Sequence, residues 1–204
     1  MKPLVSVLLP FRDPGRFLPA ALECVLRQTL RDLEVIAVDD GSRDGSAERL
    51  ERVGDPRVLL VRSGGRGLVG ALNLGIEIAR GTYVARMDAD DLCAPDRIGR
   101  QVAFLERSPS HVLVGTRFAA IDAEDRILYE LPVPCGDAEI RAGLLTGNRF
   151  QHGSVVMRAE ALRAAGGYRA AMRLVEDYDL WTRLAERGRL ANLPLLPYWW
   201  RVHR

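Results

Sequence analysis

Short apolar runs alternate with amphipathic runs along the chain up to residue 91. The apolar runs are rich in Val, Leu and Ile and have the length of buried strands, at residues 4–9, 33–38, 58–61 and 83–87. Between them, apolar residues recur at the spacing of one helix face, at residues 18–26, 47–53 and 68–79. A strand followed by a helix, repeated in this way, predicts an α/β fold with a mostly parallel, doubly wound central sheet.

The pattern changes after residue 91. Helical spacing is found at residues 98–105, 137–145, 159–165 and 179–187, and strand patterns at residues 112–121, 126–131, 154–157 and 198–202. This order is typical of a mixed α/β second half. Because the sequence has no internal repeat, low-complexity segment or linker, we expect one domain over residues 1–204.

Three carboxylates follow the fourth predicted strand directly. A buried strand cannot continue through Asp88, Asp90 and Asp91, because a buried unpaired charge is too costly. The acids therefore lie at the carboxyl end of a strand, where open α/β sheets bind ligands. Clustered carboxylates repel unless a proton or cation lies between them, so we expect Mg²⁺ or Mn²⁺. The alternative is a polar loop in which Asp91 or Asp96 caps the next helix, which explains one acid rather than three.

A second pair of carboxylates, Asp39 and Asp40, follows the second predicted strand. Gly41 and Gly45 come next and allow a tight turn into a helix. A carboxylate at this position can accept hydrogen bonds from a ring N–H or from sugar hydroxyls. The alternative is a plain turn with a capping residue, which suits Asp44 better than the first two acids.

Composition is ordinary for a globular protein and excludes several classes of function. A net charge of +2 with scattered arginines gives no case for binding nucleic acid. Cys24, Cys93 and Cys135 are far apart and odd in number, which predicts neither a metal site nor disulfides but a reducing, cytoplasmic location. The apolar run at residues 4–9 is too short for a signal peptide. No run approaches the roughly 20 apolar residues of a membrane helix.

The chain resembles the family 2 inverting glycosyltransferases, which have the GT-A nucleotide-sugar-binding fold. The matching motifs occur in family order at residues 5–11, 38–45, 71–76, 85–91, 151–154, 166–168, 176–181 and 201–203. Each motif is weak alone, but the ordered set is specific and covers nearly the whole chain. The resemblance implies one GT-A catalytic domain with a nucleotide-binding half, residues 1–91, and an acceptor and catalytic half, residues 92–204.

The resemblance also implies roles for residues of the first half. Asp39 would hold the nucleobase, in a pocket lined by Pro10 and Phe11. Asp88 and Asp90 would be the two acids of the D-x-D motif. Asp90 would bind the Mn²⁺ or Mg²⁺ ion directly, and Asp88 would contact the ribose or the metal's water.

In the second half, Asp177 would be the general base, and His203 would approach the metal or the diphosphate. Asp177 lies at the start of a predicted helix, where the helix N-terminus favours its ionised form. Three further residues are candidates for acceptor binding or support. Glu176 would cap or orient the helix start, His152 would line the acceptor side or satisfy a core hydrogen bond, and Trp181 would stack on a sugar or lie in the core.

The implied activity is hexosyl transfer from a nucleotide sugar, with a UDP-sugar expected first, to an acceptor hydroxyl. We expect a glycan or lipid-linked acceptor, a role in cell-surface polysaccharide or glycan synthesis, and peripheral association at the inner face of the membrane. A nucleotidyltransferase is an alternative, but residues 10–13 make a poor phosphate loop. A receiver-type signalling domain would place its acids in a different order. An inactive nucleotide-sugar-binding module also remains, although Asp90 and Asp177 are both present.

Overall fold

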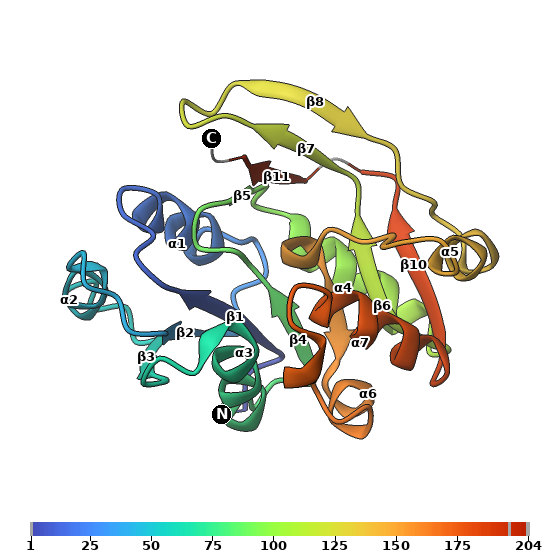
Figure 1. The fold of residues 1–204 in the computed structure, drawn as a ribbon, viewed down its shortest axis with the longest axis horizontal. Helices are drawn as coiled ribbons and strands as arrows, with labels where there is room; N and C mark the ends of the chain where they lie inside the picture. Colours follow the sequence, from blue (N-terminus) through green and yellow to red (C-terminus); the bar gives the residue numbers. More distant parts are fainter. Residues whose placement is uncertain (1, 196, 203–204) are drawn as a thin grey trace.

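Parallel strands organise the larger of two sheets. The computed structural model describes residues 2–195 and 197–202. The seven strands of this sheet lie in the order β10-β6-β9-β4-β1-β2-β3 (Figure 1). Only β9 runs antiparallel to its two neighbours. The bounds are β1 Val5–Phe11, β2 Leu33–Asp39, β3 Val58–Arg62, β4 Tyr83–Arg86, β6 His111–Thr116, β9 Val156–Arg158 and β10 Arg189–Leu193.

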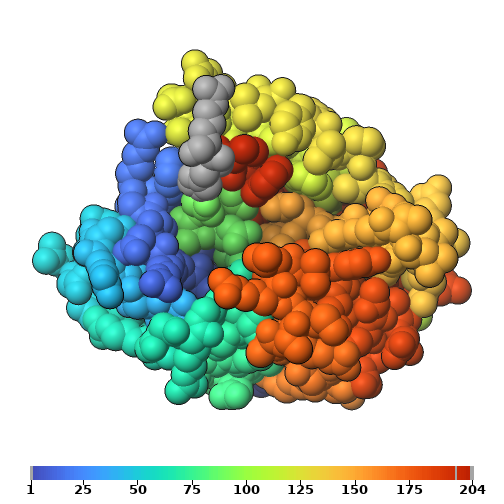
Figure 2. Space-filling view, in the orientation of Figure 1, coloured from blue at the N-terminus to red at the C-terminus, as the bar shows by residue number. Residues whose placement is uncertain are grey.

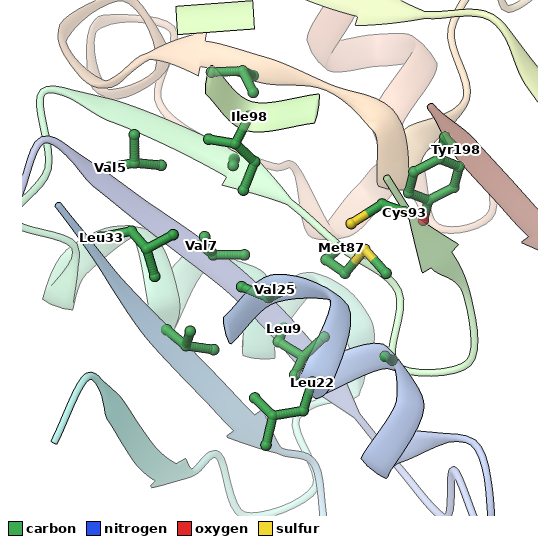
Figure 3. Close-up of a cluster of buried hydrophobic side chains, with 14 of the residues drawn as sticks. Val5, Val7, Leu9, Leu22, Val25, Leu33, Met87, Cys93, Ile98 and Tyr198 are labelled. Carbon is green, nitrogen blue, oxygen red and sulfur yellow. The ribbon is translucent and has the colours of Figure 1, made fainter. Parts of the chain in front are cut away.

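Helices cover both faces of this sheet because its strands are apolar on both faces. Successive residues of a strand point to opposite faces, so Val7 and Leu9 of β1 meet α1, as Figure 3 shows, while Leu8 meets α3. Helices α1 and α4 lie on the first face, and α3, α5, α6 and α7 on the second. The bounds are α1 Leu18–Leu26, α2 Ser46–Glu51, α3 Gly67–Ile78, α4 Arg97–Arg107, α5 Asp137–Leu144, α6 Ala159–Ala164 and α7 Glu176–Ala185, with short 3-10 turns η1 His152–Ser154 and η2 Ala170–Met172.

A second, four-stranded sheet lies beyond the carboxyl end of β4 (Figure 1). Its order is β5-β11-β7-β8, with bounds β5 Leu92–Cys93, β11 Tyr198–Arg201, β7 Phe118–Ile121 and β8 Ile127–Leu131. The single strand predicted at residues 112–121 is wrong. It is two strands, β6 and β7, which part at Arg117 and join different sheets. The prediction of a mixed second half is confirmed.

The first four strands end at one edge of the large sheet. In the parallel register, Phe11 of β1 pairs with Asp39 of β2, and Leu8 pairs with Arg86 of β4. The predicted parallel arrangement of these strands is therefore confirmed. The residues that follow each strand are brought to the same edge.

Candidate active site

A cleft of about 760 Å³ lies over this edge of the sheet. Its lining comes from the end of β1, the turn before α3 and the segment before α7, and includes Phe11, Asp40, Arg66, Arg173 and Glu176. A second hollow of about 410 Å³ shares residues 10–12 with the cleft and extends to Asp88 and Asp90. Figure 2 shows the face on which N-terminal, central and C-terminal segments of the chain meet.

The two acids after β2 have different surroundings. Asp39 is buried, and its Oδ1 accepts a hydrogen bond from the Ser42 N–H at 2.8 Å. Asp40 lines the cleft, and its Oδ1 accepts from the Ser63 hydroxyl at 2.5 Å and the Gly67 N–H at 3.1 Å. Its Oδ2 accepts no hydrogen bond from the described residues. The geometry therefore brings Asp40 into the cleft wall, while nucleobase binding by Asp39 stays a prediction.

The third acid after β4 is structural. Asp91 is 1% exposed and accepts hydrogen bonds from the Tyr198 hydroxyl at 2.5 Å and the Arg201 N–H at 2.7 Å. Burial, followed by the charges of Asp88 and Asp90, raises its pKa well above the usual range. The alternative in which Asp91 caps the next helix is therefore wrong, because this side chain fastens the acidic loop to β11.

Asp96 does precede α4, but its carboxylate does not cap the helix. Its Oδ2 instead accepts a hydrogen bond from Arg100 Nε at 2.5 Å, one turn along the helix. Neither of the two acids expected as caps therefore fills that role.

Asp88 and Asp90 line the hollow and supply hard oxygen ligands. Asp88 also accepts a hydrogen bond at its Oδ1 from the buried Arg86 guanidinium at 2.6 Å. Among the described residues, no group of three metal-ligating side chains converges. Mg²⁺ is commonly held by one or two carboxylates together with substrate phosphates, so this donor set fits a divalent ion that arrives with a nucleotide. The predicted ligand His203 lies outside the described residues.

Asp177 lies at the start of α7, as the sequence predicts. Its Oδ2 accepts a hydrogen bond from Asn148 Nδ2 at 2.6 Å, and its Oδ1 accepts one from the Tyr178 N–H at 2.7 Å. Burial raises the pKa of this carboxyl group above its usual value, and the negative charge of Glu176 raises it further, against the effect of the two hydrogen bonds. A carboxylate with a raised pKa is suited to accept a proton near neutral pH.

Glu176 is only 8% exposed, and its Oε2 is buried without a hydrogen-bond partner among the described residues. It lines the cleft, so a ligand with hydrogen-bond donors could satisfy it. Tyr168 is a buried side chain on which the charges of several of these acids act. Burial raises the pKa of its hydroxyl, and the charges of Asp177, Asp88 and Glu176 add to the rise while Arg86 opposes it. Acids after β4 and at the start of α7 therefore lie near enough to one buried side chain for their charges to act on it.

Trp181 and His152 lie behind these acids. Trp181 is 0% exposed and packs edge-on against Phe150 and His152, so stacking on a sugar is wrong and the core role is confirmed. His152 Nε2 lies 2.8 Å from the Tyr168 hydroxyl. Burial and the charge of Arg86 lower the pKa of His152 well below its usual value, so the imidazole is neutral. It supports Tyr168 through this hydrogen bond, one of the two roles that the sequence left open.

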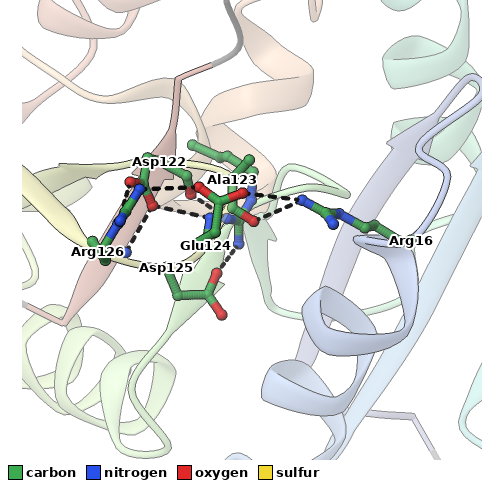
Figure 4. A network of polar contacts seen from close by, with 7 residues as sticks. Arg16, Asp122, Ala123, Glu124, Asp125 and Arg126 are labelled. Atoms are coloured by element: carbon green, nitrogen blue, oxygen red, sulfur yellow. Dashed lines mark hydrogen bonds and ion pairs between the residues drawn. The ribbon is translucent and has the colours of Figure 1, made fainter.

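Several functional neighbours were not predicted from the sequence. Arg201 of β11 donates to the Asp90 carbonyl at 2.6 Å and to Asp125 Oδ1 at 2.6 Å. The turn at residues 122–125 also reaches Arg16 on the rim of the hollow, whose Nη2 donates to the Ala123 carbonyl at 3.0 Å (Figure 4). The second sheet thus fastens the acidic loop and the rim together.

A mostly parallel α/β sheet with acids at a cleft over its carboxyl edge has a candidate ligand site at the position where open α/β folds bind their ligands. The family model for glycosyl transferase family 2 matches residues 6–166, and the chain belongs to this family. The amylovoran biosynthesis glycosyltransferase AmsE of Erwinia amylovora is 35% identical over 94% of this chain and 73% of its own length.

Two solved structures share the GT-A fold. TarS 1-349 of S. aureus in complex with UDP has a TM-score of 0.77 at 17% identity, over 97% of this chain and 60% of its own. The mannosyltransferase PcManGT of Pyrobaculum calidifontis, in complex with GDP-Man and Mn²⁺, has a TM-score of 0.76 at 21% identity, over 98% of this chain and 57% of its own. The chain therefore spans less than two thirds of the solved structures it matches. None of the described helices is long and apolar enough to cross a membrane.

Proposed function

We propose that this chain is a metal-dependent, inverting glycosyltransferase that moves a sugar from a UDP-sugar to an acceptor hydroxyl. The observation that carries the proposal is the cleft and the hollow at the carboxyl edge of the sheet, which share residues 10–12 and are lined by Glu176 in the cleft and by Asp88 and Asp90 in the hollow. A leaving nucleotide, a metal and a base are the three elements that such a transfer requires.

The donor would occupy the cleft and the hollow together, held mainly by residues 1–91, the proposed nucleotide-binding half. Pro10 and Phe11 line both spaces and would flank the base. Asp39 or its neighbour Asp40 would accept a hydrogen bond from the ring N–H of uracil. The UDP complex of TarS supports this nucleotide, while the mannosyltransferase binds GDP-Man.

Asp90 would bind the divalent ion directly, and Asp88 would contact the ribose or the metal's water. His203 is kept as a proposed ligand from the sequence. The ion would neutralise the charge that develops on the departing diphosphate. The Mn²⁺ in the mannosyltransferase complex supports this choice of metal.

Asp177 would remove the proton from the acceptor hydroxyl as the oxygen attacks the anomeric carbon. A new carbon–oxygen bond forms on one face while the bond to the diphosphate oxygen breaks on the other, which inverts the anomeric centre. Asn148 Nδ2 donates to the Asp177 carboxylate at 2.6 Å and would orient it for this step. Glu176 would accept hydrogen bonds from hydroxyl groups of the sugar, because its buried carboxylate has no partner among the described residues.

The acceptor would be a glycan or a lipid-linked sugar in polysaccharide synthesis, which the name of AmsE supports. The three cysteines are free thiols, which suits a reducing compartment. We therefore place the reaction in the cytoplasm, with peripheral association at the inner face of the membrane.

A thermal-shift screen of UDP-, GDP-, CDP- and dTDP-sugars, with Mn²⁺ or with a chelator, tests the proposal. A ligand at 100 times its Kd adds about 2.7 kcal/mol to stability, or roughly 5–11 °C in Tm for a chain of this size. We expect a shift from UDP-sugars that needs Mn²⁺. The absence of a shift with every nucleotide sugar would refute a donor-binding site. Binding without transfer to any acceptor would favour the inactive binding module.

A further inference from the structure

Arg86 is a buried cation directly behind the proposed D-x-D motif. It ends β4 and is 1% exposed, although a guanidinium is among the groups most costly to bury. Its Nη2 donates to Asp88 Oδ1 at 2.6 Å, and its Nη1 donates to the Met87 carbonyl. Its Nε has no partner among the described residues. One carboxylate thus provides the compensating charge.

Among the described residues, the ion pair is confined to Arg86 and Asp88, and the other ionisable side chains nearby do not share it. Burial opposes the charge, yet Asp88, Tyr168 and Tyr198 together hold the pKa of Arg86 above its usual value. The nearby His152 is neutral, as described above. Arg97 also lies close, but it donates to the Arg86 and Gly153 carbonyls, at 3.1 and 3.2 Å, and not to Asp88.

Asp88 is held from two further directions. Its backbone N–H donates to the Tyr198 hydroxyl at 3.4 Å. On the other side lies Gly153, where an added Cβ would come within 2.7 Å of Asp88 Oδ2 and 1.8 Å of the Tyr198 hydroxyl oxygen. The carboxylate therefore has its Oδ1 bound to a buried cation, its Oδ2 beside a glycine, and 30% of its side chain exposed toward the hollow.

We propose that Arg86 is a positioning residue that fixes the Asp88 carboxylate, so that Asp88 acts toward the donor as an oriented hydrogen-bond acceptor while Asp90 remains the direct metal ligand. The inference rests on the proposed function, since it concerns the donor nucleotide. A carboxylate already compensated by a guanidinium is a weaker ligand for a second cation. The buried cation therefore separates the roles of two identical side chains in one motif.

A double-mutant cycle tests the proposal by calorimetry of UDP binding in the presence of Mn²⁺. Arg86→Met should weaken UDP binding about tenfold, because an acceptor that turns away loses one oriented hydrogen bond worth about 1.4 kcal/mol. Asp88→Asn should weaken it similarly. If Arg86 acts through Asp88, the double variant should bind as weakly as Asp88→Asn alone, within about twofold.

Arg158→Met is the matched control. Among the described residues, the guanidinium of Arg158 donates its hydrogen bonds to backbone carbonyls, including His111 at 2.8 Å and Leu105 at 2.7 Å, so its loss should lower Tm without changing UDP affinity. Arg86→Lys keeps the charge but not the forked geometry. If Arg86→Met does not fold, the Lys variant takes its place in the cycle.

The wild-type protein distinguishes a failure of the proposed function from a failure of the positioning role. If wild type binds no nucleotide, the proposed function fails. If wild type binds UDP but the losses of Arg86 and Asp88 multiply independently, or Arg86→Met leaves affinity unchanged, the positioning role is overturned. A drop in Tm with unchanged UDP affinity would likewise assign Arg86 to structure alone.

Discussion

Replacing Asp177 by Asn separates catalysis from folding. Asn has the same shape but cannot take up the proton of an acceptor hydroxyl. Its carbonyl oxygen keeps the hydrogen bond from the Tyr178 N–H, which is 2.7 Å long in the native chain. A positioned general base contributes ~10²–10⁴-fold to rate, or about 2.7–5.4 kcal/mol of barrier. We therefore expect kcat to fall by that factor.

The expected loss of stability is much smaller. Removing the negative charge gives up about 0.3–1 kcal/mol of attraction to the helix N-terminus, but the raised pKa of Asp177 shows that burial and Glu176 disfavour this charge, so Tm should change by less than roughly 4 °C. Turning the Asn148 amide to present its oxygen would give up the hydrogen bond that this oxygen accepts from the Phe150 N–H, so the contact to residue 177 is weakened by at most one hydrogen bond of about 1 kcal/mol. The rate effect should thus exceed the stability effect severalfold in free energy.

Asp179→Asn is a control within the same helical turn. Asp179 Oδ2 accepts two hydrogen bonds from Arg183, at 2.6 and 3.0 Å, with both side chains 11% exposed. Breaking this pair should cost about 1.5–3 kcal/mol, roughly 3–12 °C in Tm, and leave kcat within a factor of two or so. The two variants should therefore show opposite patterns, one in rate and one in Tm.

The assay measures nucleoside diphosphate release from the selected donor, with and without an acceptor oligosaccharide, beside calorimetry of UDP. UDP binding should be nearly unchanged in Asp177→Asn. If that variant keeps more than about a tenth of wild-type turnover, the loss is too small for a general base and the assignment is wrong.

Four shorter predictions address other parts of the site. A chelator should abolish transfer, and added Mn²⁺ should restore it. Asp90→Asn should remove most of the activity without unfolding the chain. Full activity in the chelated enzyme would contradict the metal role. UDP should bind more tightly than CDP by calorimetry, because cytosine lacks the ring N–H, and equal affinities would contradict a carboxylate acceptor. The general base must be ionised, so kcat should fall as the pH drops through the raised pKa of Asp177. Glu176→Gln removes a repulsive negative charge, so it should lower this pKa and move the acidic limb of the pH profile to lower pH. Tyr198→Phe removes a hydrogen bond to buried Asp91 and should lower Tm by roughly 3–12 °C in a thermal-shift assay, whereas an unchanged Tm would show that the bond is dispensable.

The first half of the fold could be predicted because β1, β2 and β4 are buried on both faces, β3 is a short apolar run at the edge of the sheet, and the helices have one apolar face. Two strands could not be predicted. Residues Leu92–Cys93 form β5 only because β11 lies beside them, and no pattern of two residues can indicate that. Strand β10 mixes polar and apolar residues, and its pairing with β6 supplies the hydrogen bonds that define it. In both cases tertiary contacts, and not local preference, decide the structure.

The acids of the site could be located from the sequence, but their partners could not. An acidic run after an apolar strand is visible locally. By contrast, the hydrogen bonds from Tyr198 and Arg201 to Asp91 span 107 and 110 residues of chain. The buried position of Arg86 could not be predicted for another reason. It stands inside an apolar run, where a single arginine looks like the exposed end of a strand until its burial is known.

The acidic loop shows why a count of carboxylates does not give a count of metal ligands. The sequence suggests that three acids need one cation. In the structure, the Asp91 carboxylate accepts two hydrogen bonds from β11, and the Asp88 carboxylate pairs with the guanidinium of Arg86. Asp90 lines the hollow, and Arg201 donates a hydrogen bond to its backbone carbonyl. Asp88 and Asp91 are thus identical side chains in one acidic run, but a guanidinium from β4 pairs with one and hydroxyl and amide donors from β11 bind the other, so their surroundings decide what each carboxylate can do.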